Sequence, residues 1–222
     1  DEMSSRGLGD VYKRQQPLLT FRAQAKPWVE DRQAFVAFDN GQLLSFGTRE
    51  GELRWSVRVS QPQGITELER AVDLDASPVV SGPFVLAAGA NGRVVAVAKG
   101  SGKITWAEDA SVFNDLSVSD DTLVYVDENS HLHARTVTAG RELWVSKKLH
   151  RRGVSAPAIV GDYVAAVDDS NYLHLLNVAS GEFAARRSLL GNGYQSPMLV
   201  ENDVLYVMSD NGALSAYRVA AK

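Results

Sequence analysis

Short apolar runs alternate with turn residues along most of the chain. The runs are four to seven residues long and rich in Val, Leu and aromatic residues, and Gly, Asn or Ser stands at the intervening turns. This pattern is typical of strands joined by hairpins. The clearest runs are residues 34–38, 43–46, 53–59, 84–88, 94–98, 123–126, 163–167 and 204–208. None approaches the roughly 18 residues of a membrane-spanning helix, so the pattern predicts an all-β protein.

The strands belong to a repeat of about 40 residues. Tight-turn positions recur at Gly41, Gly92, Ser130, Asn171 and Gly212. A second glycine follows the first four turns by ten residues, at Gly51, Gly102, Gly140 and Gly181. A tryptophan stands four residues beyond three of these glycines, at Trp55, Trp106 and Trp144. Each unit holds four strands, and such units predict the blades of a β-propeller. The alternative, stacked hairpins in a sandwich, does not require this shared register.

The repeat sets the domain boundaries. Blades are expected at about residues 27–59, 77–110, 115–149, 155–189 and 196–219, with residues 16–26 as an inter-blade connector. The last unit has three strands, so the chain is expected to form a partial ring of four full blades and an incomplete fifth. Residues 1–15 show no hydrophobic period, and residues 10–15 resemble a translated transposase adapter. They are predicted to be a non-native, disordered tail; a natural disordered terminus is the alternative.

The composition of the chain excludes several classes of binding protein and several kinds of site. The 222 residues carry 23 Lys and Arg against 27 Asp and Glu, a net charge of −4, whereas nucleic-acid and anionic-membrane binders need a basic surface. The chain has no Cys, which excludes disulfides, thiolate metal sites and a Cys nucleophile. Proteins or small molecules are therefore the expected partners.

Candidate chemistry in the sequence is sparse. His131 and His133 share one face of a strand, and His174 lies in the equivalent strand one blade later. No third ligand is evident, so no metal site is expected and the histidines are interpreted as solvated or packed. Asp127 and Asp168, each followed by a second acidic residue, are interpreted as turn-forming groups rather than as acid/base pairs.

The repeat resembles the tryptophan-docking repeat of quinoprotein-like propellers, because a small residue, a glycine and a tryptophan recur at fixed spacing, as at Ala96, Gly102 and Trp106. Three segments narrow the resemblance to the BamB family: SQPQGITELER at 60–70, DLDASPVV at 73–80 and YLHLLNV at 172–178. The resemblance covers about residues 17–219.

The resemblance implies a non-enzymatic scaffold without a cofactor. Its parent would be an eight-bladed propeller on the periplasmic face of the bacterial outer membrane, held by a lipid anchor in an N-terminal part that precedes this chain. It would bind the POTRA domains of BamA and assist the insertion of β-barrel proteins, with unfolded outer-membrane proteins as further candidate partners. The tryptophans and their glycines would dock each blade on the next.

The resemblance also assigns the BamA-binding residues to two connectors. They are Leu19, Phe21 and Arg22 in the first, and Asp73 and Asp75 in the second; Phe21 replaces the family's Leu. Independently, both connectors join consecutive blades and so lie on one face, and the second is long, with 23 positions from Trp55 to Pro78. The alternative is that Arg22 pairs with Asp73 or Asp75 inside the chain.

A second function class is a quinoprotein-like dehydrogenase with a quinone cofactor and calcium. Such enzymes resemble one another in a cofactor-stacking Trp, in carboxylate ligands for calcium and commonly in a vicinal Cys pair. The chain has no Cys, and three of its Trp residues stand at the structural position of the repeat. The scaffold is therefore the favoured prediction.

Overall fold

In the residues that the computed structural model describes, all elements are β-strands, and they form five antiparallel sheets. The structure describes residues 25–38, 40–60, 74, 76–90, 92–194 and 196–219. The predicted tail, residues 1–15, lies outside these ranges. No helix in the described part of the chain is long and apolar enough to cross a membrane.

Each sheet is one blade, with its strands in sequence order. The first blade holds β1 (Trp28–Glu30), β2 (Gln33–Phe38), β3 (Gln42–Gly47) and β4 (Leu53–Arg58). The second holds β5 (Val79–Ser81), β6 (Phe84–Ala88), β7 (Arg93–Ala98) and β8 (Ile104–Asp109). The third holds β9 (Ser117–Ser119), β10 (Thr122–Val126), β11 (Leu132–Thr136) and β12 (Glu142–Ser146). The fourth holds β13 (Ala158–Val160), β14 (Tyr163–Val167), β15 (Tyr172–Asn177) and β16 (Phe183–Ser188). The fifth holds β17 (Leu199–Glu201), β18 (Val204–Met208) and β19 (Leu214–Arg218).

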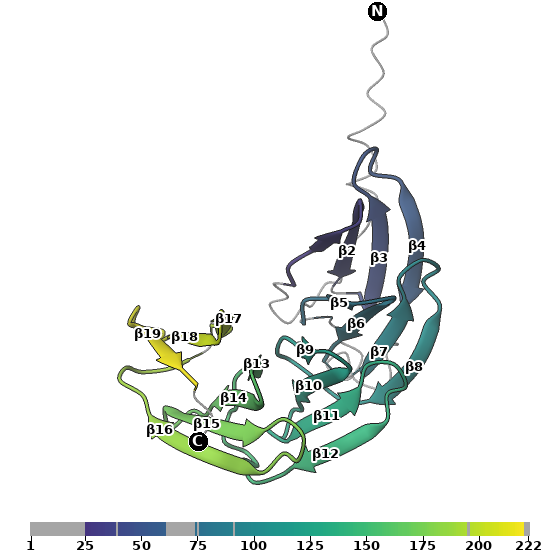
Figure 1. Cartoon of the computed structure of the whole chain (residues 1–222). Helices are drawn as coiled ribbons and strands as arrows, with labels where there is room; N and C mark the ends of the chain where they lie inside the picture. Colours follow the sequence, from purple (N-terminus) through teal and green to yellow (C-terminus); the bar gives the residue numbers. More distant parts are fainter. Residues whose placement is uncertain are drawn as a thin grey trace, which may run out of the picture.

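The blades follow one another round an open arc, with β9 and β13 on the inside and β8, β12 and β16 on the outside (Figure 1). The inner strands adjoin, since β9 contacts both β5 and β13. The predicted fold class is therefore confirmed: an all-β propeller architecture with four four-stranded blades, a three-stranded fifth and a partial ring.

The core lies between the blades. Successive side chains of a strand point to opposite faces, so Val85 of β6 packs with the first blade while the next residue, Leu86, packs with the third. A blade with neighbours on both sides buries both faces, which is why β6 has no exposed residue. The end blades instead carry exposed apolar residues, including Val29 and Leu214, which are 65% and 66% exposed.

The spacing of small residue and tryptophan in the first three blades has a structural cause, a register shift that the fourth blade shares without a tryptophan. In the second blade Ala96 pairs with Trp106 across β7 and β8, and the register shifts immediately afterwards. The same shift follows the pairs Ser45 with Trp55 and Ala134 with Trp144, and the pair Leu175 with Ala185 in the fourth blade. At each bulge one strand has an extra residue, which bends that strand and increases its local twist.

Candidate functional site

One end of the blades is built from two kinds of loop. The hairpin loops joining the second and third strands of a blade are hydrogen-bonded to the connector that enters the same blade. Thus the Glu128 N–H donates to the Ser111 carbonyl at 3.0 Å, and the Asp169 N–H to the Arg152 carbonyl at 2.9 Å. The Asp210 N–H makes the equivalent bond to the Gly193 carbonyl at 3.0 Å. We call this end the connector face; it includes hairpin loops 127–131, 168–171 and 209–213 with connectors 110–116 and 147–157.

The predicted partner-binding residues lie outside the described part of the chain. These are Leu19, Phe21, Arg22, Asp73 and Asp75. The described ends of their two connectors do meet, because the Lys26 N–H donates to Ser77 Oγ at 3.0 Å. Leu74, between the two aspartates, is fully buried in the core shared by the first and second blades. Both connectors are thus tied to the same part of the molecule.

The three tryptophans of the repeat pack on glycines of the following blade. Their indole Nε1–H groups donate to carbonyls there: Trp55 to Lys99 at 2.9 Å, Trp106 to Val137 at 2.7 Å and Trp144 to Val178 at 2.8 Å. A Cβ on Gly102, Gly140 or Gly181 would lie 2.5–2.8 Å from the indole of the preceding blade. Gly51 also has a positive φ, +70°, but no described atom lies within 4 Å of the place where its Cβ would be.

Asp127 closes the hairpin loop of the third blade. Its Oδ1 accepts the backbone N–H groups of Asn129 and His131, both at 2.9 Å. This is the Asx-turn arrangement, in which a short carboxylate satisfies loop N–H groups that lack a strand partner. The interpretation of Asp127 as a turn-forming residue is confirmed.

Two histidines converge on the other oxygen of Asp127. Oδ2 lies 3.1 Å from His131 Nδ1 and 3.0 Å from His133 Nε2. His150, from connector 147–157, places its Nδ1 2.9 Å from His131 Nε2. The expectation that no third ligand joins His131 and His133 is therefore wrong, because the hairpin brings Asp127 back over the start of β11. The sequence repeat marks this loop position, since Asp127, Asp168 and Ser209 recur every 41 residues.

The electrostatics of Asp127 favour its charged form. Burial raises the pKa of this carboxyl, but the His131 N–H, the His133 hydrogen bond and the charges of both histidines outweigh it. The net result is a pKa below the usual range for Asp. The His133 ring stacks on Tyr125 with centroids 4.8 Å apart and planes 2° apart.

Asp168 occupies the equivalent place in the fourth blade with different partners. Its Oδ1 accepts the N–H groups of Ser170 and Tyr172, at 3.1 and 3.0 Å. Its Oδ2 lies 2.8 Å from His174 Nε2 and accepts Arg152 Nε at 2.9 Å. Burial raises the pKa of Asp168, yet the bonds from His174 and Tyr172 and the Arg152 charge lower it overall. The side chain of Asp168 is completely buried and that of Arg152 is 39% exposed.

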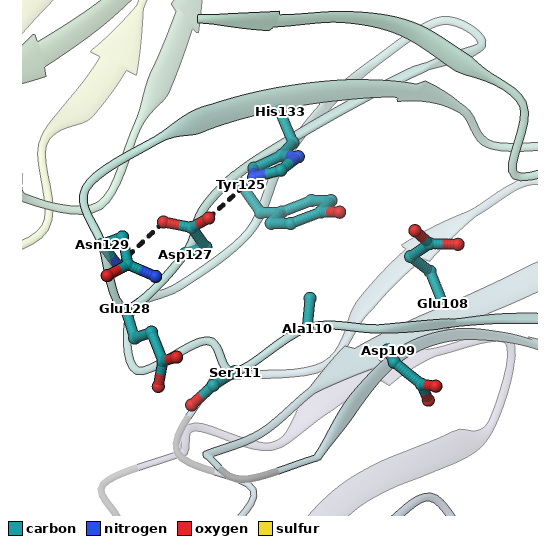
Figure 2. A pocket seen from close by; sticks show the side chains of 9 residues that line it. All are labelled: Glu108, Asp109, Ala110, Ser111, Tyr125, Asp127, Glu128, Asn129 and His133. Carbon is teal, nitrogen blue, oxygen red and sulfur yellow. Dashed lines mark hydrogen bonds and ion pairs between the residues drawn. The ribbon is translucent and has the colours of Figure 1, made fainter. Parts of the chain in front are cut away.

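A cleft of about 320 Å³ lies beside Asp127, between the outer end of the second blade and the third blade. Figure 2 shows Asp127 and His133 on one side, with Glu108 and Asp109 across from them. The other described residues that line it are Ala110, Ser111, Tyr125, Glu128 and Asn129, so no Lys or Arg is among the described lining residues. Glu108 pairs with Arg135, whose Nε also donates to the Tyr125 hydroxyl at 3.2 Å. The cleft is acidic and can attract a cation.

A family model described as outer membrane protein assembly factor BamB matches residues 10–146 and 136–221. The chain belongs to the BamB family. BamB of Yersinia pestis is 32% identical over 90% of this chain and 51% of its own length. BamB of Escherichia coli K12 is 30% identical over 89% of this chain and 50% of its own length. The chain thus spans about half the length of these relatives.

Solved structures agree on the fold. The crystal structure of BamB from Moraxella catarrhalis superimposes with a TM-score of 0.85 at 24% identity, covering 94% of this chain and 62% of that one. A europium-containing methanol dehydrogenase superimposes with a TM-score of 0.67 at 11% identity, covering 83% of this chain and 51% of that one. Both likenesses concern the propeller architecture, and propellers support many unrelated functions.

Proposed function

We propose that this chain is part of a scaffold subunit of the machinery that assembles β-barrel proteins in the bacterial outer membrane. The observation that carries the proposal is membership of the BamB family, whose relatives are named as outer membrane protein assembly factors. The proposed activity is binding rather than catalysis. The proposed location is the periplasmic face of the outer membrane, with lipid attachment of the parent protein.

The proposed partner surface is formed by connectors 16–26 and 60–76 and receives the POTRA domains of BamA. Leu19 and Phe21 would supply apolar anchors, and Arg22 with Asp73 and Asp75 a charged rim, which is the usual anatomy of a protein interface. The hydrogen bond between Lys26 and Ser77 supports this grouping, because it fixes the ends of both connectors together. Long loops on a rigid sheet scaffold are frequent binding elements.

The test measures the affinity of the purified chain for the isolated POTRA domains of BamA. Arg22→Glu and Asp75→Arg, made separately, are each expected to weaken binding at least about tenfold, since a reversed charge opposes the complementary group. Arg141→Glu is the matched control: Arg141 is exposed in the turn between β11 and β12, at the opposite end of the blade from the connector face. Circular dichroism verifies that each variant keeps its β-structure.

Unchanged affinity in both Arg22→Glu and Asp75→Arg contradicts the assignment of the two connectors. Equal loss in Arg141→Glu also contradicts it, because the effect would then follow net charge rather than position. Absence of POTRA binding by the unmodified chain contradicts the proposed partner itself.

A further inference from the structure

The cluster formed by Asp127, His131 and His133 has the composition of a metal site. We propose that these three residues bind a divalent transition-metal ion of the Zn²⁺ type. Two imidazoles and one carboxylate suit Zn²⁺, Cu²⁺ or Ni²⁺ better than Mg²⁺ or Ca²⁺, which prefer sets of oxygen ligands. None of the three residues belongs to the connectors proposed to receive BamA.

The ligand atoms already lie close together. One ligand atom from each of Asp127, His131 and His133 lies within 4.8 Å of the other two. Ligands about 2.0–2.1 Å from a tetrahedral ion are about 3.3 Å apart. The separations of 3.1 and 3.0 Å from the carboxylate oxygen to the two imidazole nitrogens need to widen by only a few tenths of an ångström.

Each ligand is held by a separate contact. Asp127 is fixed through its other oxygen by the N–H groups of Asn129 and His131. His133 is stacked on Tyr125, which is fully buried, and His131 is stacked on His150 with ring centroids 5.0 Å apart. Little side-chain entropy is therefore lost when the ion binds, and preorganisation of this kind raises affinity.

His150 serves as an outer partner of the site. Metal binding through His131 Nδ1 requires the proton of that ring to be on Nε2. His131 Nε2 lies 2.9 Å from His150 Nδ1, which can accept its hydrogen bond. Hydrogen bonds of this type set the tautomer and orientation of ligating histidines. The ion would thereby link the hairpin loop 127–131 to connector 147–157 on the connector face.

The surroundings favour a cation. Asp127 and His133 line the acidic cleft, so a fourth coordination position can be filled from solvent, and Asp109 and Glu128 add negative charge nearby (Figure 2). At the equivalent site in the fourth blade, Arg152 donates a hydrogen bond to the Asp168 carboxylate, and its positive charge would repel a metal ion. The position equivalent to Arg152 beside Asp127 is Ser111, whose backbone carbonyl makes the corresponding hydrogen bond.

The test is a zinc titration of the chelator-treated, purified chain, followed by calorimetry and by competition with a chromophoric chelator. The expected result is one Zn²⁺ per chain. His131→Asn and His133→Gln, which keep a hydrogen-bonding nitrogen but remove the imidazole, are expected to bind at least about 100-fold more weakly. His150→Ala, which removes only the outer partner, is expected to lose about 10–100-fold.

His174→Gln is the matched control, because His174 holds the equivalent place against Asp168 without a second histidine. It is expected to leave zinc affinity within about twofold of the unmodified chain. Cobalt substitution gives a second readout: visible d–d absorption of a tetrahedral ion, present in the unmodified chain and in His174→Gln, and absent in His133→Gln. No stoichiometric zinc binding, equal binding by His131→Asn and His133→Gln, or equal loss in His174→Gln would overturn the proposal.

Discussion

The hairpin loops of the third and fourth blades both use an aspartate to accept N–H groups of the loop. The other oxygen of that aspartate has different partners in the two loops. In both, an aspartate 41 residues from its counterpart accepts two loop N–H groups through one oxygen. In the fourth blade the second oxygen accepts Arg152 Nε and lies 2.8 Å from His174 Nε2. In the third blade it faces His131 and His133 instead. A guanidinium is always charged, whereas an imidazole can lose its proton and bind a metal.

The comparison shows how a repeat can keep its fold while one unit acquires new chemistry. The ring geometry is nearly the same in both blades: His131 and His133 have centroids 6.4 Å apart, and so do Tyr172 and His174. Two positions therefore decide whether the aspartate of each loop can bind an ion. One is at the start of the third strand, and the other is in the connector. In the third blade, His131 and Ser111 leave the Asp127 carboxylate available to an ion. In the fourth blade, Arg152 binds the Asp168 carboxylate, and Tyr172 stands where the third blade has His131.

The largest expected effect comes from removing the two aspartates in turn. Asp168→Ala leaves Arg152, His174 and two loop N–H groups without their buried acceptor, so we expect unfolding free energy to fall by about 2–4 kcal/mol. Asp127→Ala is expected to cost about 1–2 kcal/mol in the metal-free chain, because its side chain is 15% exposed and its described partners are histidines rather than a guanidinium. Urea denaturation of both variants provides the measurement. Equal losses would show that Arg152 does not distinguish the two loops.

Acidification is expected to remove the stabilisation that the charged form of Asp168 provides. A carboxyl whose pKa is lowered by folding stabilises the protein above its unfolded pKa of about 3.9, and this contribution is lost as the pH falls through the folded value. Asp168 has such a lowered pKa. The stability difference between the unmodified chain and Asp168→Asn should therefore be full at pH 6 and shrink toward pH 3. Urea midpoints across this range test it, and a difference that stays constant with pH contradicts the account.

Much of the fold follows from the sequence because the repeat is structural in origin. The tryptophan spacing reflects a bulge and an inter-blade contact that recur in the first three blades, so the register of Trp55, Trp106 and Trp144 is visible without coordinates. The uniformly apolar β6 likewise follows from its two buried faces.

The chemistry of the loops was harder to predict. Asp127 and His133 are only six residues apart, but their convergence depends on the turn geometry of the hairpin. His150 and Arg152 reach the two sites from a connector, and no local periodicity places a connector side chain. The predicted partner residues, such as Arg22 and Asp75, fall outside the described ranges, so their role stays a prediction.

The most direct measurement exchanges the two positions that distinguish the loops and counts bound zinc. Ser111→Arg supplies the third blade with the guanidinium of the fourth and keeps all three proposed ligands. Arg152→Ser combined with Tyr172→His gives the fourth blade the histidine pair of the third, beside Asp168. The expected zinc content is one ion for the unmodified chain, none for Ser111→Arg and two for the double variant. One ion per chain in all three proteins would contradict the account, because the connector and strand positions would then have no control over the site.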